Sequence, residues 1–227
     1  MKLGPSVTQS RPTNLETAQS LLARRRMTPF YRFLGVASWP FLHGLYRLEV
    51  RGLERLPSEG GYVLASNHAS NFDPWLLGMP LYPERQLRFM AKSELFNPVL
   101  APFVWAGGGF PVKRGERDLE AIETAVSLVR AGEIVVMFPE GTRQKKGLNK
   151  KFEARPRTGT ARIALEAGVP LVPAAIEGTG RLSRLERLRV AFGAPVSLDD
   201  LRGEEPDAAL VATERLMDAI AELRRDL

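Results

Sequence analysis

The chain has 227 residues, of which 44% are hydrophobic, and this is enough for one well-buried domain and a small appendage. It contains no cysteine, which excludes thiol nucleophiles, disulfides, zinc clusters and iron–sulfur sites. The 32 Lys and Arg residues outnumber the 26 Asp and Glu residues, and the net charge of +6 favours a phosphorylated substrate, an acidic membrane surface or nucleic acid without choosing among them.

The amino-terminal part of the chain precedes any strand pattern. Residues 1–13 lack the apolar core and cleavage site of a secretory signal, so we expect a flexible lead-in and a protein on the cytoplasmic side. Residues 14–46 are predicted to be helical, because Asn14 can cap a helix and a stretch rich in aromatic and aliphatic residues follows. With arginines near both ends, this stretch is typical of an interfacial membrane helix or helix pair, although a core-packed helix would share the pattern.

Residues 47–227 alternate between two hydrophobic patterns. Short apolar or alternating runs predict strands, and longer runs with apolar residues every three or four positions predict helices. The alternation predicts an α/β domain with a central mixed, mostly parallel sheet flanked by helices. No clean run of about 20 apolar residues is visible, so no spanning helix is expected. The expected strands are 45–52, 61–67, 87–92, 133–139, 169–178 and 188–196, and the expected helices are 73–81, 117–132, 158–168 and 206–227.

The segment SNHASNFDPW, residues 66–75, places His68 just after a predicted strand. A neutral imidazole can take a proton from a hydroxyl, and Asp73 can orient the ring through its other nitrogen if the loop folds back. Alternatively, Asp73 caps a helix that starts at Pro74, and both roles are compatible because capping uses one carboxylate oxygen and leaves the other for His68. No G-x-S-x-G elbow is present, so the attacking hydroxyl would belong to a substrate.

Two further segments combine glycine with basic residues. GGGFPVKR, residues 107–114, allows close backbone approach and supplies two cations, but it lacks the third glycine of a nucleotide fingerprint. FPEGTR, residues 138–143, follows an apolar strand and offers backbone N–H groups, a hydroxyl and a guanidinium, which is typical of an anion cradle. A simple turn followed by a mobile charged loop would contain the same residues.

A fourth segment, residues 166–180, reads EAGVPLVPAAIEGTG and is predicted to be a core strand with Glu177 at its exit.

In order and spacing, the four segments resemble the four blocks of the glycerolipid acyltransferases, specifically the 1-acyl-glycerol-3-phosphate acyltransferases, over about residues 60–180. The resemblance implies transfer of an acyl chain from acyl-CoA or acyl-carrier protein to the free sn-2 hydroxyl of lysophosphatidic acid, giving phosphatidic acid. No cofactor or metal is expected.

The resemblance also implies roles for individual residues. His68 would be the general base and Asp73 its orienting partner, with Asn67 in the same block, while Pro173 would contact the acyl donor or pack. Gln144 replaces a serine often seen after the third block, and the second block is richer in glycine than usual. The glycerol phosphate would be bound by Lys113, Arg114, Glu140, Gly141, Thr142 and Arg143.

Because a lysophospholipid stays in the bilayer, residues 14–46 would anchor the enzyme to the cytoplasmic face of an anionic membrane as a peripheral or monotopic protein. Three alternatives remain open: a glycerol-3-phosphate acyltransferase, an acyltransferase for another lysophospholipid, and a non-catalytic basic membrane-binding protein. A nucleic-acid partner is not expected, because the chain has no recognisable reading motif.

Overall fold

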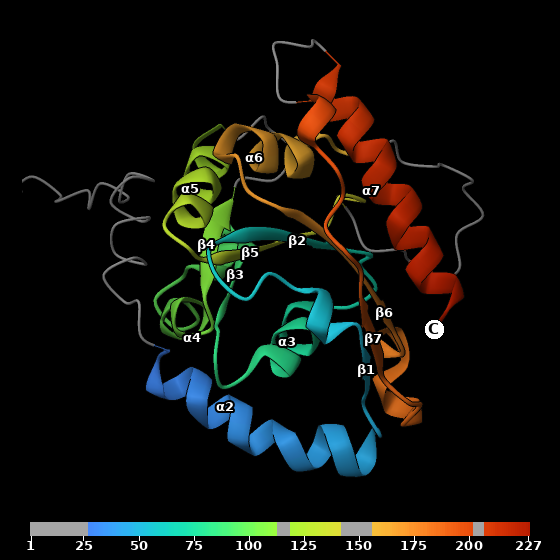
Figure 1. Cartoon of the computed structure of the whole chain (residues 1–227). Helices are drawn as coiled ribbons and strands as arrows, with labels where there is room; N and C mark the ends of the chain where they lie inside the picture. The colour runs from blue at the N-terminus through green and yellow to red at the C-terminus, as the bar shows by residue number, and fades with distance from the viewer. Residues whose placement is uncertain (1–26, 113–118, 142–155, 202–206) are drawn as a thin grey trace, which may run out of the picture.

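The computed structural model describes residues 27–112, 119–141, 156–201 and 207–227, which form a seven-stranded sheet with helices on both faces (Figure 1). The strand order is β1-β7-β6-β2-β5-β3-β4, and every neighbouring pair is parallel except β6 and β7. The predicted fold class is therefore confirmed. The strands are β1 Glu49–Arg51, β2 Tyr62–Ser66, β3 Leu87–Lys92, β4 Gly109–Val112, β5 Ile134–Met137, β6 Leu171–Glu177 and β7 Arg189–Phe192.

The helices differ in length and in the sheet face that they cover. α5, α6 and α7 cover one face, while α3 and α4 lie on the other and α2 runs along the outside of that layer (Figure 1). The α-helices are α2 Pro29–Pro40, α3 Asp73–Gly78, α4 Ala101–Ala106, α5 Leu119–Arg130, α6 Gly159–Ala167 and α7 Ala208–Arg225. Short helical turns are η1 Phe41–Leu45, η2 Leu53–Arg55, η3 Met79–Leu81, η4 Ser93–Leu95, η5 Thr179–Arg184 and η6 Asp199–Leu201.

The central strand β2 is buried at all five positions, as its uninterrupted apolar sequence predicts for a strand covered on both faces. Successive side chains point to opposite faces, so β2 contributes to two separate hydrophobic cores. One core joins the sheet to α5, α6 and α7 through Val63, Ala65, Ala125, Leu128, Ala161, Ala164, Ala212 and Leu216. The other joins it to α3 and η1 through Tyr62, Leu64, Leu42, Leu76 and Leu77.

The segment between β3 and α5 is where the sequence analysis missed regular structure. The sequence pattern predicts no element in residues 93–112, because prolines and three consecutive glycines break both hydrophobic periodicities. The structure has α4 and β4 there, and β4 begins at the last of these glycines, Gly109. Gly108 has a φ of +96°, and a Cβ at this position would collide with the carbonyl oxygen of Leu87. These glycines therefore allow a chain reversal and the close pairing of β4 with β3.

The amino-terminal helix region begins with Thr28, whose hydroxyl accepts a hydrogen bond from the Tyr31 N–H and donates one to the carbonyl oxygen of Ala106. α2 ends at Pro40, which has no N–H to continue the helical ladder, and the chain continues as the π-helical turn η1. The expected helix beginning near Asn14 lies outside the described residues. Within the part of the chain that the structure describes, no helix has the length and apolarity needed to cross a bilayer.

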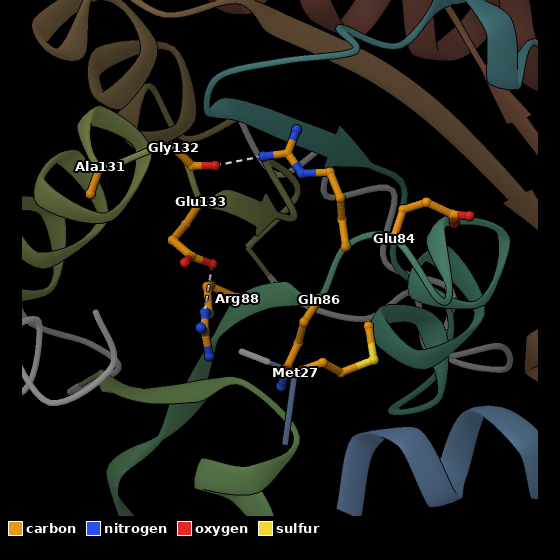
Figure 2. Close-up of a pocket in the computed structure, with 8 residues that line it drawn as sticks. Met27, Glu84, Gln86, Arg88, Ala131, Gly132 and Glu133 are labelled. Atoms are coloured by element: carbon orange, nitrogen blue, oxygen red, sulfur yellow. Dashed lines mark hydrogen bonds and ion pairs between the residues drawn. The ribbon is translucent and has the colours of Figure 1, made fainter. Parts of the chain in front are cut away.

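A polar cavity of about 250 Å³ lies where β3 and β5 begin, at the amino edge of the sheet (Figure 2). The guanidinium of Arg88, whose side chain is 2% exposed, pairs through Nε with the Glu133 carboxylate at 3.0 Å. Arg85 donates to the carbonyl oxygens of Gly60 and Gly132 at 2.6 and 2.5 Å. These contacts tie the start of β3 to the start of β5, so the cavity lining has a structural role.

We predict that Glu133→Gln lowers the free energy of unfolding by about 3–5 kcal/mol, because it leaves the buried Arg88 guanidinium without a compensating charge. The matched control is Glu84→Gln, which changes an exposed carboxylate in the same cavity lining and should alter stability by no more than about 0.5 kcal/mol. Urea denaturation of both variants measures the difference. Equal losses in the two variants would contradict the structural role of the ion pair.

Candidate active site

The candidate site lies at the carboxyl edge of the sheet, where β2, β5 and β6 end side by side. Because these strands are parallel, the loops that follow them meet at one edge. The loop after β2 carries His68, and the loop after β5 carries Glu140 and Gly141. Gly180, which follows β6, has its α-carbon facing the Ala69 side chain. Three of the four sequence segments therefore meet here, although they are far apart in the chain.

Asn67 fixes the start of the loop after β2. Its side-chain amide donates to the carbonyl oxygen of Ile176 and accepts from the N–H of the same residue, both at 2.9 Å. The side-chain amide thus makes the two hydrogen bonds to β6 that the backbone of a residue in a neighbouring strand would make. This pair of bonds is buried, and it sets the direction in which the chain leaves the sheet toward His68.

His68 and Asp73 are in direct contact. The His68 Nδ1 atom lies 2.8 Å from Asp73 Oδ2, and the same oxygen accepts the N–H groups of Ala69 and Ser70 at 2.7 and 2.8 Å. The predicted loop closure therefore occurs. The prediction that one carboxylate oxygen caps the helix while the other contacts His68 is wrong. Oδ2 makes all three contacts, and Oδ1 has no partner among the described residues. Asp73 is the first residue of α3, and its side chain braces the preceding loop instead of capping the helix.

The geometry determines which nitrogen of His68 is available for chemistry. A carboxylate only accepts hydrogen bonds, so Nδ1 carries the proton that is donated to Asp73, and Nε2 keeps its lone pair. The ring stacks on Phe138, with centroids 4.0 Å apart and planes 19° apart, and the residue is only 8% exposed. An imidazole held in one orientation and one tautomer can act as a general base for a hydroxyl placed near Nε2.

Glu140 is the second acidic side chain near His68. Its carboxylate is half-buried, and this burial raises its pKa, while a hydrogen bond from the His68 backbone N–H and the charge of Arg224 act in the opposite direction. The carboxylate thus braces the His68 main chain. Its Oε2 atom, Asp73 Oδ1 and the hydroxyl of Thr179 are buried side-chain atoms without a hydrogen-bond partner in the described ranges. This edge of the sheet therefore has hydrogen-bonding capacity left for a polar substrate.

Arg157 is a cation beside this loop, and the sequence pattern placed it among the basic residues of a mobile charged loop without assigning it a role in the site. Gly141 has a φ of +69°, and a Cβ there would lie 2.7 Å from Arg157 Nε, so the arginine side chain rests against the glycine backbone. The Arg157 N–H also donates to the carbonyl oxygen of Pro139 at 2.9 Å. The position of Arg157 just before α6 was the available signal, because a helix that leads into the next parallel strand starts at the carboxyl edge.

The other residues that the sequence singled out lie in different places. Pro173 lies inside β6, opposite Ala65, and its ring fills the position that a Cβ at Gly193 would occupy. This contact is consistent with the prediction that Pro173 has a packing role. Glu177 forms an ion pair with Arg189 at 2.6 Å and takes no part in the His68 cluster. The predicted phosphate ligands Lys113, Arg114, Thr142 and Arg143, together with Gln144, lie outside the described residues.

The arrangement of the acidic side chains and of His68 also shows whether the described residues could hold a metal ion. Among the residues with described positions, no group of three or more His, Asp or Glu side chains is arranged to hold a metal ion. The acidic groups Asp73 and Glu140 at the carboxyl edge are instead hydrogen-bonded to the His68 loop. These residues can provide proton transfer at Nε2 and binding of anionic groups by arginine.

Comparison with known proteins adds independent information. The family model described as Acyltransferase matches residues 47–177. A 1-acyl-sn-glycerol-3-phosphate acyltransferase of Bacillus subtilis is 34% identical over 187 residues, which cover 79% of this chain and 89% of that protein. A chloroplast enzyme of the same description from Brassica napus is 32% identical over 171 residues, which cover 71% of this chain and 46% of that protein.

A solved structure shares the fold. The crystal structure of the 1-acyl-sn-glycerophosphate acyltransferase PlsC from Thermotoga maritima superposes with a TM-score of 0.59. The match covers 93% of this chain and 81% of the other, at 21% sequence identity. At this identity the likeness is one of fold, and it covers more of the chain than the family match to residues 47–177 does.

We predict that Glu140→Gln stabilises the protein relative to the unsubstituted chain by an amount that grows as the pH rises from about 4 to about 7. A carboxyl whose pKa is raised on folding contributes stability below its unfolded pKa and loses that contribution as the pH rises through the folded pKa. The glutamine cannot ionise, so it avoids the cost. Urea denaturation of both proteins across this range measures the difference, and a constant difference would contradict the prediction.

Proposed function

The chain belongs to the acyltransferase family, and we propose that it transfers a fatty acyl group from acyl-CoA or acyl-carrier protein to the free sn-2 hydroxyl of 1-acyl-glycerol 3-phosphate, giving phosphatidic acid. The observation that carries the proposal is the buried hydrogen bond between His68 Nδ1 and Asp73, which leaves Nε2 available as a base. The proposed acceptor is the one for which the relatives are named, and the proposed acyl donor is a co-substrate, with no further cofactor.

The proposed reaction needs no nucleophile from the protein. The acceptor hydroxyl gives its proton to His68 Nε2 as its oxygen attacks the thioester carbonyl carbon, forming a C–O bond. Asp73 stabilises the imidazolium through Nδ1, as a carboxylate does in other base-activated acyl transfers. When the tetrahedral intermediate collapses, the C–S bond breaks and the proton passes from Nε2 to the departing thiolate.

Binding of the acceptor phosphate is assigned to basic residues. Lys113, Arg114 and Arg143 are proposed from the family resemblance, with the Gly141 backbone and the Thr142 hydroxyl in the same cradle. We assign Arg157 to this group because its guanidinium lies against Gly141. Glu140 has the wrong charge for a phosphate ligand, and its hydrogen bond with the His68 N–H supports a positioning role instead.

We also propose that the protein binds a membrane surface, because the acceptor carries an acyl chain that stays in the bilayer. α2 buries Gly35 and Ser38 on one side, while Phe33, Val36 and Trp39 are 67%, 65% and 60% exposed. A helix with one exposed apolar face fits an interfacial position on the cytoplasmic leaflet, as a peripheral or monotopic protein. Unchanged binding to anionic vesicles after polar substitution of the exposed α2 residues would contradict this part of the proposal.

We predict that His68→Ala lowers kcat by about 10²–10⁴-fold in a protein that still folds, since it removes the proposed base. The matched control is His43→Ala, which replaces the only other histidine, an exposed side chain whose ring packs at a tilt against Trp39. Release of free thiol from acyl-CoA, with detergent-dispersed lysophosphatidic acid as acceptor, measures both variants. Full turnover by His68→Ala would overturn the mechanism.

An acceptor panel in the same assay separates the related activities. Lysophosphatidic acid, other lysophospholipids and glycerol 3-phosphate are offered one at a time, with acyl-CoA or acyl-carrier protein as donor. The proposal expects lysophosphatidic acid to have the highest kcat/KM. Preference for glycerol 3-phosphate or for a lysophospholipid with a larger headgroup would identify a different acyltransferase, and absence of transfer to every acceptor would reject the enzyme assignment.

We predict that Arg157→Ala raises the KM for lysophosphatidic acid by about ten- to a hundredfold and changes kcat much less, because a phosphate contact is present in ground state and transition state alike. Arg157→Lys should recover part of the loss, since an ammonium keeps the charge without the forked geometry. The control Arg162→Ala removes an exposed arginine on α6 that pairs with Glu166. An unchanged KM in Arg157→Ala would remove Arg157 from the site.

A further inference from the structure

A second exposed apolar surface is formed by η4 and α4, in the segment where the sequence analysis assigned no element. Val99 is 73% exposed, Phe103 55%, Leu100 42% and Leu95 40%. Exposed apolar side chains that occur singly are ordinary, whereas a group of them in one short segment marks an interaction surface. Nothing in the reaction proposed for His68 uses these residues.

The η4–α4 surface is continuous with the exposed face of α2. Phe103 packs edge-to-face on Phe30 of α2, with ring centroids 5.5 Å apart. The hydroxyl of Thr28, just before α2, and the side-chain amide of Gln86 both donate to the carbonyl oxygen of Ala106, the last residue of α4, at 2.7 and 3.0 Å. These contacts hold α2 and α4 side by side, as Figure 1 also shows.

Exposed apolar side chains are unevenly distributed over the described part of the chain. Fourteen large hydrophobic residues are exposed there, and nine of them belong to residues 33–45 and 95–103. The others are scattered over separate elements, as Leu185 and Leu210 are. The two segments together therefore form the principal apolar surface of the described structure.

The charges in these two segments indicate the kind of partner. Between residues 27 and 47 and between 92 and 106, the charged side chains are Arg32, Arg47, Lys92 and Glu94. Apolar side chains accompanied by three basic groups and one acidic group match an anionic lipid surface, where the apolar groups enter the interface and the cations contact headgroups. A protein partner would have to cover two separate chain segments at once.

The position of η4 relates this surface to the active site. η4 begins at Ser93, directly after Lys92, the last residue of β3, and so starts at the carboxyl edge of the sheet. His68 lies at the same edge. On the other side, the Trp75 indole N–H of α3 donates to the Ser38 hydroxyl of α2 at 3.0 Å, which joins α2 to the helix that begins with Asp73.

From these observations we propose that η4 and α4 form a second membrane-contact element, which enters an anionic bilayer interface together with α2. Two contacts from distant parts of the chain fix the orientation of the protein on the membrane, whereas a single helix would leave it free to rotate. The carboxyl edge of the sheet then faces an acceptor that remains in the leaflet. The inference rests on the proposed function, because a lipid acceptor is the reason for the protein to bind a membrane. The surface itself takes no part in the acyl-transfer reaction.

The experiment compares three double variants of the full-length chain. Val99→Ser with Phe103→Ser alters the η4–α4 surface, Phe33→Ser with Trp39→Ser alters α2, and Leu185→Ser with Leu210→Ser is a control of similar exposure on other elements. Binding is measured by sedimentation with phosphatidylglycerol vesicles, and kcat is measured with detergent-dispersed lysophosphatidic acid. We expect the η4–α4 variant to bind vesicles about tenfold or more weakly, with its kcat and the binding of the control unchanged.

A second measurement reports insertion directly and does not depend on the serine variants folding. The chain has no cysteine, so Val99→Cys and Leu185→Cys can each be labelled at one position with an environment-sensitive fluorophore. On addition of vesicles, the label at position 99 should shift to the blue and be quenched by brominated lipid, whereas the label at position 185 should not respond.

The outcomes separate the two proposals. Unchanged vesicle binding together with an unresponsive label at position 99 would overturn the second membrane element, whether or not acyl transfer is observed. A concentration-dependent dimer in analytical ultracentrifugation that the Val99→Ser, Phe103→Ser variant loses would also overturn it, because a second copy of the chain would then cover the surface. Weakened binding in a protein that transfers no acyl group would support the surface and reject the proposed reaction.

Discussion

The parallel pairing of β2 with β5 and β6 is the constraint on which the candidate site depends. β2 is buried on both faces, and its register with the two neighbouring strands brings their carboxyl ends to one edge. Asn67 extends the pairing by one residue through its two bonds to Ile176, so the loop toward His68 leaves the sheet in one direction. A shift of β2 by one residue would exchange its two core faces and move His68 away from Glu140.

The electrostatics of the site follow from this arrangement. Asp73 Oδ2 receives three hydrogen-bond donors, and the Glu140 carboxylate receives the backbone N–H of His68, so two acidic groups brace one imidazole from its side chain and its main chain. Arg157 lies against the backbone of Gly141. Acidic groups therefore lie around the His68 imidazole, where they would stabilise an imidazolium if His68 acts as the proposed base, and Arg157 supplies positive charge at the proposed phosphate site. The exposed apolar surface of α2 and α4, proposed above as a lipid contact, is formed by other residues than these.

Much of the fold was predictable from local pattern. The apolar runs around β2, β5 and β6 and the helical periodicity of α5, α6 and α7 identified these elements with small differences at their ends. The segment from Ser93 to Val112 was not predictable in this way, because its prolines and glycines satisfy neither periodicity. There α4 is stabilised by packing on Phe30, and β4 by pairing with β3, and both interactions join residues that are distant in the chain.

The amino-acid sequence by itself determined the chemistry available to this protein: a histidine five residues before an aspartate, an inventory without cysteine, and basic residues beside glycine-containing loops. These are properties of residue type and short spacing, which survive in the unfolded chain. Only the tertiary structure decided that one oxygen of Asp73 makes all three contacts, that Glu140 braces the His68 backbone and that Arg157 lies beside Gly141. Each of these depends on where a turn places a side chain relative to a distant strand, and packing over the whole sheet sets that position.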